Sequence, residues 1–358
     1  MTSIMASGNA AVASRLRYPL QTEPEVGDGS AVEVAPGVLW LRMPLFAALP
    51  WINVWAVKEQ GGWAIVDTGL HSPNTIAAWQ AAFAGALRGE PASRVIVTHM
   101  HPDHCGLAGW LVERGRLQLW MSRLEYLTCR IMAADSGSDA PRDAIDFYRG
   151  AGWDDAAIGR YREKFGAFGD MIYPLPASYR RFADGDTLKL GAHEWTVIVG
   201  SGHSPEHACL YCPALKLLIA GDQVLPKISS NVSVYPQEPD ADPLGEWIGS
   251  LAMIKRRIPD DVLVLPAHNS PFHGLHARIE ELGESHRQGL ARLQQLLCEP
   301  RRAVDVFAAL FARPISSGLM GMATGEALAH LNYLLRRGLA ARELDARGVW
   351  WWRASAGA

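Results

Sequence analysis

The residues around position 100 include four side chains that can bind metal ions. His99 and His101 follow an apolar, β-branched run that predicts a strand, and residues two apart in a strand point to one face. Pro102 ends that strand, so Asp103 and His104 fall at a turn where a helix begins and can point back toward the same place. Neutral imidazole and carboxylate groups suit Zn²⁺ and similar divalent ions. The segment therefore predicts a metal site with a coordination position left for water.

Three further residues of ligand type stand just after later predicted strands. They are His203 in Gly-Ser-Gly-His, Asp222 in Ala-Gly-Asp-Gln and His268 in Pro-Ala-His-Asn. A single histidine at such a place is about as often a hydrogen-bonded structural residue as a ligand. Loops at strand ends are, however, where binding and catalytic residues collect. Together with the four residues of the first segment, the set of seven predicts one metal centre.

The rest of the sequence predicts a layered α/β protein. Residues 32–69 read as a meander of strands, and an Ala-rich helical stretch that begins near Pro73 separates them from the strand before His99. A second set of strands occupies residues 179–266. Between the two sets, residues 123–171 are mostly helical, and we expect them to form a lid insert. Strands and helices thus recur twice, which favours stacked layers.

These motifs resemble those of the metallo-β-lactamase-fold hydrolase superfamily. The resemblance covers about residues 32–278, and its motifs are Asp67 in Val-Asp-Thr-Gly, the His-x-His-x-Asp-His segment, and His203, Asp222 and His268 in that order. It implies an αββα sandwich made of two similar halves, with the site at the edge where the halves meet. This implied fold agrees with the twofold recurrence of strands and helices.

The resemblance also implies two metal ions and a role for each residue. The implied ligands are His99, His101 and His203 for the first ion, Asp103, His104 and His268 for the second, and Asp222 as a bridge between them. Asp67 would hold a ligand histidine in its tautomer, and Asp103 would also orient the nucleophile, so these two are the predicted catalytic residues. We expect zinc, with iron or manganese as alternatives.

The chemistry that follows is hydrolysis. Two neighbouring divalent ions lower the pKa of a shared water to about 7, so a metal-bridging hydroxide can attack an ester-like bond. We therefore expect a binuclear zinc-dependent hydrolase that cleaves a thioester, lactone or carboxylic ester of a small molecule. A metal-dependent endoribonuclease or phosphodiesterase is the first alternative, and a mono-iron sulfur oxidoreductase is the second. A flavodiiron role is disfavoured because His101 stands where that branch of the superfamily carries glutamate.

Large side chains in and just after the helical insert bear on the substrate. They are Tyr126, Phe147, Tyr148, Tyr161, Phe165, Phe168, Met171 and Tyr173. We expect at least half of them to be the buried faces of amphipathic helices. The remainder would line an apolar pocket, which favours an acyl or lactone substrate over a highly charged one.

Three smaller features accompany the ligand motifs. Where many members of the superfamily read Gly-His-Thr-Pro-Gly-His, this chain carries Glu206, which would alter either the loop or the surroundings of the ligands. Cys105 directly follows His104, and we interpret it as a packing residue rather than a nucleophile. Cys209 and Cys212 form a Cys-x-x-Cys motif within a predicted strand, where residues three apart point to opposite faces. A zinc or redox role for this pair is therefore disfavoured.

Composition limits the classes of protein that remain. The chain has 358 residues with 49% hydrophobic residues, a formal net charge of −3 and no polybasic character overall, which excludes a histone-like protein. No apolar run approaches the roughly 20 residues that span a bilayer. Five cysteines are too few and too scattered for a disulfide-stapled secreted domain, so we expect a soluble, cytoplasmic protein without a membrane partner. Residues 1–30 are expected to form a flexible tail.

The C-terminal residues differ in charge from the rest. From residue 285 onward the chain has ten arginines, no lysine and five acidic residues, a net charge of about +5, which leaves about −8 for the remainder. Three helices and a hairpin are predicted at 284–358, after a catalytic domain at 31–283, and they resemble the winged-helix extension of some superfamily members. Some of those members are endoribonucleases. Nucleic-acid binding is less favoured here than a homodimer contact or a cover over the active site, with Trp350, Trp351 and Trp352 as apolar contact surface.

Overall fold

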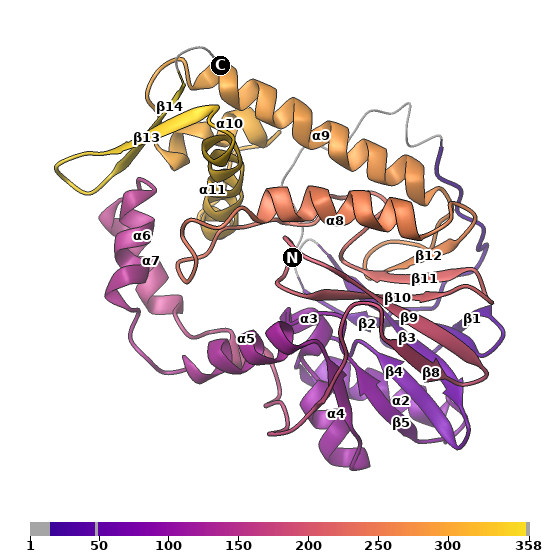
Figure 1. Ribbon diagram of the computed structural model, residues 1–358. Helices are drawn as coiled ribbons and strands as arrows, with labels where there is room; N and C mark the ends of the chain where they lie inside the picture. Colours follow the sequence, from indigo (N-terminus) through magenta and orange to yellow (C-terminus); the bar gives the residue numbers. More distant parts are fainter. Residues whose placement is uncertain (1–14, 47–48, 356–358) are drawn as a thin grey trace.

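The computed structural model describes residues 15–46 and 49–355, and two sheets lie face to face at its centre (Figure 1). The strands of the first sheet, in spatial order, are β1 (Val32–Ala35), β2 (Val38–Pro44), β3 (Trp51–Glu59), β4 (Gly62–Val66), β5 (Ala92–Ile96), β6 (Leu119–Met121) and β7 (Arg180–Arg181). Those of the second sheet are β12 (Leu263–Pro266), β11 (Leu217–Gly221), β10 (His207–Cys212), β9 (His193–Gly200) and β8 (Thr187–Leu190).

The two sheets repeat one topological pattern. In each, an antiparallel meander ends in a strand that pairs in parallel with its next neighbour, β4 with β5 in the first sheet and β11 with β12 in the second. Parallel strands need a crossover connection, and α2 (Pro73–Ala84) and α8 (Pro243–Arg257) supply it. The predicted twofold recurrence of strands and helices is therefore a repeat of one unit, which consists of a meander, a crossover helix and a parallel strand. Ser72 caps α2 by accepting a hydrogen bond from the Thr75 backbone N–H, with Pro73 in the first turn.

Apolar side chains alternate between the two faces of each sheet, so that one face packs on the other sheet and the opposite face packs on helices. The result is an αββα sandwich. On β3, Trp55 and Val57 face the second sheet, while Val54 and Ala56 face the outer helices. Trp195 of β9 lies in the same core between the sheets and is fully buried. The outer layers are α2 and α4 (Ala108–Gly115) on the first sheet, and α8 and α9 (Leu275–Leu296) on the second (Figure 1).

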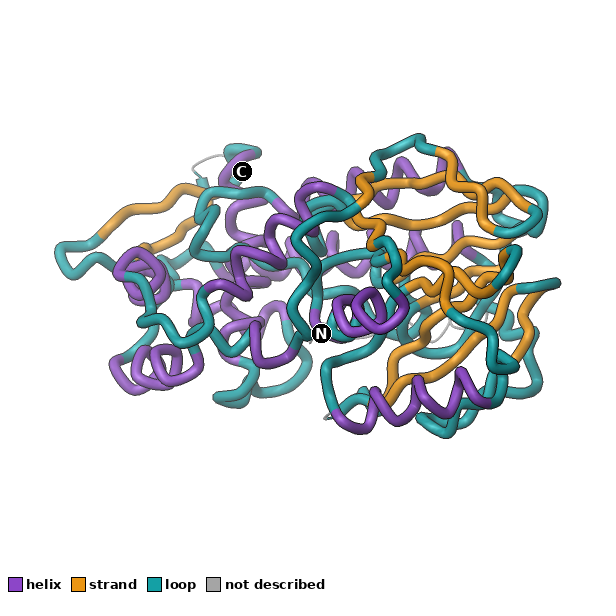
Figure 2. The backbone as a smooth tube through the Cα atoms, turned by 90° about the horizontal axis from the view of Figure 1, so that it is seen from below, coloured by secondary structure: helices purple, strands orange, loops and turns teal. Residues whose placement is uncertain are grey.

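The helical insert consists of α5 (Arg123–Ala134), α6 (Arg142–Gly150), α7 (Asp155–Lys164) and a short 3₁₀ turn, η1 (Gly169–Met171). Its far end, α6 and α7, lies on the side of α11 and the C-terminal hairpin, away from the two large sheets (Figure 1). Figure 2 shows the large sheets on one side of the molecule and a separate pair of strands among helices on the other. Trp153 donates its indole N–H to Thr324 Oγ1 at 2.9 Å, and the Val304 backbone N–H donates to the Ala151 carbonyl at 3.2 Å. The insert is therefore fastened to the C-terminal residues.

The C-terminal part contains η2 (Ala303–Val306), α10 (Phe307–Leu310), α11 (Met320–Arg336) and an antiparallel hairpin of β13 (Ala340–Leu344) and β14 (Trp350–Ala354). Helix α9 passes Gly283 without a break, so the domain boundary that we predict there lies inside a helix. One hydrophobic cluster joins Trp247 of α8, Leu293 of α9, Leu331 of α11 and Trp352 of β14. The C-terminal part is thus packed onto the second sheet's outer layer.

The prediction of a flexible tail at residues 1–30 is wrong for its second half. Leu16 is buried, and Arg17 exchanges backbone hydrogen bonds with His273 at 3.1 and 2.8 Å. Val26 forms a bridge with Arg42 of β2. Residues 15–30 are therefore held against the sandwich, because they complete pairing at its edge, while residues 1–14 lie outside the described residues.

None of the helices in the described part of the chain combines the length and apolar composition needed to cross a membrane.

Cys105, Cys209 and Cys212 are buried in the core. Cys209 packs on the helix side of β10 and Cys212 on the side between the sheets, so the two thiols face opposite ways. Cys105 is buried, with its thiol 3.0 Å from the Met100 carbonyl and 3.7 Å from the thiol of Cys129.

Candidate metal centre

The loop that carries the first histidines lies beyond the end of β5, and Asp67 holds it in place. β5 ends at Ile96, so His99 and His101 lie in the following loop, and the prediction that they stand on a strand is wrong. Asp67, directly after β4, accepts the Thr98 backbone N–H on Oδ1 and the Thr98 hydroxyl on Oδ2, both at 2.8 Å. The Asp67 carboxylate thus takes the place of a neighbouring strand as the acceptor of the Thr98 backbone N–H, and it sets the path of the loop.

The loop nevertheless brings both histidines to one point. His99 Nε2 lies 2.9 Å from His101 Nδ1 and 3.3 Å from His203 Nε2. His203 comes from the loop after β9, and its Nδ1 donates to the Asn231 carbonyl at 2.6 Å, which leaves Nε2 free to face the other two rings. The candidate ligand atoms of these three residues lie within 4.8 Å of one another.

A second group forms beside the first. Pro102 opens the one-turn helix α3 (Pro102–Cys105), which aims Asp103 and His104 inward. His104 Nδ1 lies 2.8 Å from Asp67 Oδ2, so Asp67 holds this ring with Nε2 facing the site. His268, after β12, has its Nε2 3.4 Å from Asp103 Oδ2. Candidate ligand atoms of Asp103, His104 and His268 again lie within 4.8 Å of one another.

Asp222 lies between the two groups. Its Oδ1 is 3.5 Å from His104 Nε2 and 3.6 Å from His268 Nε2, whereas its Oδ2 is 3.5 Å from His203 Nε2. Gly221 before it has φ +50°, and a Cβ there would lie 2.6 Å from His207 Nε2. That nitrogen accepts the Asp222 backbone N–H at 3.0 Å. Gly221 therefore lets His207 approach and fix the backbone of Asp222.

The polar atoms at the centre fit metal ions. In the part of the chain that the structure describes, His104 Nε2, His268 Nε2 and both carboxylate oxygens of Asp222 are buried and make no hydrogen bond. Buried polar atoms are almost always hydrogen-bonded, because leaving one unpaired costs free energy. Here the unpaired atoms converge, and all are ligand types for divalent cations. Two ions, one in each group, would satisfy them together.

The protonation states of His99 and Asp222 suit metal binding. Burial and the neighbouring histidines hold the pKa of His99 well below its ordinary value, so its ring is neutral. Burial raises the pKa of the Asp222 carboxyl, but His268 and His104 outweigh that effect and hold it well below its ordinary value. A neutral imidazole and an ionised carboxylate are the forms of these two groups that bind metals.

Glu125, which our sequence analysis did not single out, joins the two ligand loops. Its Oε2 accepts the Met100 backbone N–H at 2.9 Å and its Oε1 accepts the Glu206 backbone N–H at 2.7 Å. Burial raises the pKa of Glu125 to about 7. The carboxylate of Glu206 accepts the Leu124 backbone N–H in the first turn of α5 at 2.8 Å. The unusual glutamate therefore fastens the insert to the loop after His203.

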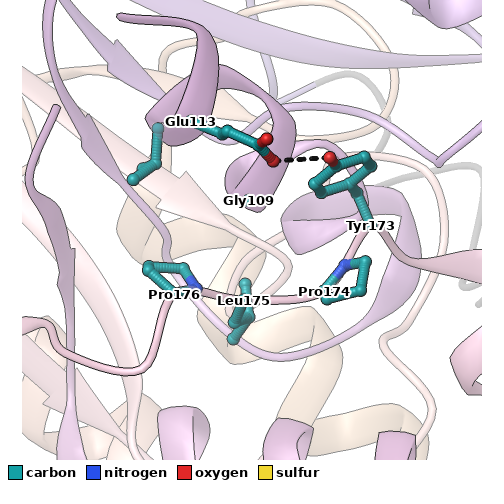
Figure 3. Close-up of a pocket in the computed structure, with 7 residues that line it drawn as sticks. Gly109, Glu113, Tyr173, Pro174, Leu175 and Pro176 are labelled. Atoms are coloured by element: carbon teal, nitrogen blue, oxygen red, sulfur yellow. Dashed lines mark hydrogen bonds between the residues drawn. The ribbon is translucent and has the colours of Figure 1, made fainter. Parts of the chain in front are cut away.

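Two cavities lie apart from this centre, and none of the seven candidate ligands lines either of them. One lies beside α4, where Tyr173 donates its hydroxyl to Glu113 at 2.5 Å above Pro174 and Leu175 (Figure 3). The other lies between α6 and the C-terminal hairpin, with Phe147 and Trp350 in its wall. Of the insert side chains, Tyr126, Tyr148 and Phe168 are buried.

Comparison with known proteins identifies the family. Residues 52–268 match the family profile of the metallo-beta-lactamase superfamily. Since this match covers more than half of the chain, the protein belongs to that superfamily. Residues 290–355 match the profile of the metallo-beta-lactamase-like C-terminal domain, so the C-terminal part is of a type found with this fold.

Similar proteins extend over nearly the whole chain. A crystal structure of a beta-lactamase domain protein from Burkholderia ambifaria is 40% identical, with a TM-score of 0.89, and the match covers 96% of this chain and 100% of that one. A metallo-beta-lactamase family protein from Thermus thermophilus shares the fold at 24% identity and a TM-score of 0.75, over 90% of this chain and 100% of that one. A Bacillus subtilis (strain 168) protein named as a probable metallo-hydrolase is 23% identical over 302 residues, 83% of this chain and 92% of its own.

Proposed function

We propose that this protein is a binuclear zinc-dependent hydrolase that cleaves an ester-like bond of a small molecule, a thioester, a lactone or a carboxylic ester. The observation that carries the proposal is the position of Asp222. Its two oxygens face different histidine groups and make no hydrogen bond, which is the arrangement of a carboxylate that bridges two ions. The name of the Bacillus subtilis relative, a probable metallo-hydrolase, supports the reaction class.

Each residue has a task in this proposal. The proposed ligands are His99, His101 and His203 for one ion, Asp103, His104 and His268 for the other, and Asp222 for both. Two bound ions would lower the pKa of a shared water to about 7 and polarise the substrate's oxygen. Asp103 is 8% exposed, the most of the seven, so its carboxylate can meet and orient an incoming water. Asp67 keeps the Nδ1 of His104 hydrogen-bonded and its Nε2 directed at the site.

The charges of the C-terminal part support a small-molecule substrate over RNA. Six of its ten arginines form ion pairs with carboxylates of this chain: Arg287, Arg302, Arg337, Arg342, Arg347 and Arg353. Arg337 and Arg342 pair with Asp242 and Asp240, which lie at the start of α8 and just before it. The other four arginines pair with acidic residues within two to ten positions of themselves in the sequence. Binding of nucleic acid needs cations that are free to contact phosphates.

A cytoplasmic location belongs to the same proposal. Four of the five cysteines, Cys105, Cys129, Cys209 and Cys212, are buried as free thiols, and Cys298 is an exposed one. Free thiols persist in a reducing compartment.

The proposal is tested with zinc-loaded protein on a panel of carboxylic esters, thioesters, lactones and a single-stranded RNA. We expect turnover of at least one ester-like class. Asp222→Asn should abolish it while the far-ultraviolet circular dichroism spectrum is retained. Undiminished turnover by Asp222→Asn, or cleavage of RNA alone, would contradict the proposal.

A further inference from the structure

We propose that the C-terminal part completes the metal centre, with the buried Glu326 of α11 positioning Asn231 and, through it, the ligand His203. The inference rests on the proposed function in that it takes His203 to be a metal ligand. It gives the C-terminal part a role in the metal centre itself, in place of a role in binding nucleic acid or a second copy of the chain. Glu326 is a positioning residue in this account, because it acts through another residue.

The first step is the contact between Asn231 and His203. Asn231 is 3% exposed and stands in the segment 229–234, between β11 and α8. Its backbone carbonyl accepts Nδ1–H of His203 at 2.6 Å. A histidine that donates from one ring nitrogen presents the other as an unprotonated ligand, so this carbonyl selects both the tautomer and the ring orientation. A shift of the Asn231 backbone would therefore move the ligand atom of His203.

The second step is the contact between Asn231 and α11. The side-chain amide of Asn231 donates to Glu326 Oε2 at 2.8 Å, and Ser233 Oγ donates to the amide oxygen at 2.7 Å. The Val234 backbone N–H donates to the Gly325 carbonyl at 3.0 Å, and a Cβ on Gly325 would lie 2.7 Å from the Ser233 side chain. The helix backbone thus lies directly on this segment. Glu326 is fully buried, so its carboxylate belongs to the interior of the protein.

A second line of contacts holds the same segment one turn further along α11. His330 Nδ1 donates to the Glu326 carbonyl at 2.8 Å, and His330 Nε2 lies 3.1 Å from His286 Nδ1 of α9. His286 Nε2 is 3.5 Å from Ser229 Oγ. Next in the chain, Ser230 donates its hydroxyl to the backbone carbonyl of Asp222. Residues 229–234 thus contact the backbone of one candidate ligand and the ring of another, and α9 and α11 hold them in place.

The position of Glu326 also bears on what the C-terminal part is for. A carboxylate taken out of water costs free energy unless it is hydrogen-bonded. An apolar side chain would pack α11 against the segment without that cost. A fully buried glutamate that accepts from Asn231 is therefore better explained by the orientation of that residue than by the stability of the helix contact.

The test compares Glu326→Leu, which removes the acceptor of the Asn231 amide and keeps an apolar side chain of similar size, with a matched control, Glu299→Leu, at an exposed position in the same part of the chain. Affinity for Zn²⁺ is measured by competition with a chromophoric chelator, and the Co²⁺-substituted proteins are compared by visible absorption. We expect Glu326→Leu to lower Zn²⁺ affinity about 10- to 100-fold and to alter the Co²⁺ spectrum, since outer contacts of metal ligands have effects of that size. Glu299→Leu should match the wild type in both measurements.

Two further variants separate positioning from a loss of stability. Asn231→Ala keeps the carbonyl but breaks the link to Glu326, and it should lower Zn²⁺ affinity as Glu326→Leu does. In a His203→Ala background, Glu326→Leu should lower the affinity of the remaining ion far less than in the wild type, because the residue through which it acts is gone. Wild-type Zn²⁺ affinity and Co²⁺ spectrum in Glu326→Leu, or an equal loss without His203, would overturn the inference.

The outcome also distinguishes this inference from the proposed function. If the wild-type protein binds two ions but cleaves none of the ester-like substrates, the proposed reaction fails while the affinity measurements still decide the role of Glu326. If the wild-type protein binds no metal, both fail together.

Discussion

At the scale of single residues, Asp67 carries much of the organisation of the site. Its backbone has φ 61°, a left-handed conformation that Asp and Asn tolerate better than most residues. From there its carboxylate accepts the backbone N–H and the hydroxyl of Thr98 and holds Nδ1 of His104. One side chain thus shapes the loop of the first histidines and orients a ligand of the second group.

Asp67→Asn tests this double role without straining the backbone, because Asn adopts the same conformation. The amide can no longer accept on both sides, so either Thr98 or His104 loses its acceptor. We expect metal affinity to fall about 10- to 100-fold, measured by chelator competition. Metal affinity equal to that of the wild type would show that Asp67 does not orient His104.

The candidate ligands could be predicted from the sequence, but the residues that hold them could not. The seven candidate ligands could be found because their types are rare together and each stands after a strand. Asn231 and Glu125 could not, because Asn231 holds His203 through a backbone carbonyl and Glu125 holds Met100 through a backbone N–H. Such contacts leave no pattern of residue types in the sequence.

At the scale of elements, strand and helix patterns predicted layered α/β architecture and the helical insert, and the resemblance to the superfamily implied the αββα sandwich. They failed at residues 97–101, where the β-branched run continues to Thr98 but the strand stops at Ile96. The reason is tertiary, since Asp67 takes the Thr98 N–H that a ladder would have used. The continuity of α9 through Gly283 was missed because a change in charge and composition near this point suggested a boundary, whereas packing on both sides keeps the helix intact.

The contact of α9 with α11 has a predicted pH signature. Burial lowers the pKa of His330 to about 4, against 6.5 for the free side chain. Between pH 6.5 and 4, His330 binds a proton in the unfolded chain but stays neutral in the folded protein. The stability that the neutral, buried His330 contributes above pH 6.5 is therefore lost as the pH falls toward 4.

His330→Gln removes this titration. We expect the pH dependence of its free energy of unfolding to be flatter than that of the wild type by about 1.4 kcal/mol per pH unit between pH 6.5 and 4. Urea unfolding of both metal-free proteins across this range measures the difference. Parallel profiles would mean that His330 accepts a proton in the folded state as easily as in the unfolded chain.

At the scale of the whole molecule, the C-terminal part shares a core with the second half of the sandwich. Trp247 of α8 packs in the same cluster as Leu293, Leu331 and Trp352. The helical insert is fastened to the same part through Trp153 and Thr324. The C-terminal part therefore belongs to the folded unit, and the molecule is not a catalytic domain with a loosely tethered appendage.

A chain that ends at residue 283 tests this unity. It would expose the buried face of α8 and lose the second half of α9, so we expect no cooperative thermal unfolding transition and weak binding of Zn²⁺. Differential scanning calorimetry against the full chain measures the first, and chelator competition the second. A truncated protein that melts cooperatively and binds two ions would refute the shared core as a requirement for folding.

The central claim is that seven residues from four segments of the chain hold two ions with Asp222 between them. Native mass spectrometry of zinc-replete protein, paired with elemental analysis, counts those ions directly. The account predicts two zinc ions per chain in the wild type and at most one in Asp222→Asn. Well under one ion per chain in the wild type would contradict it, and a single bound iron with consumption of oxygen would favour an oxidoreductase instead.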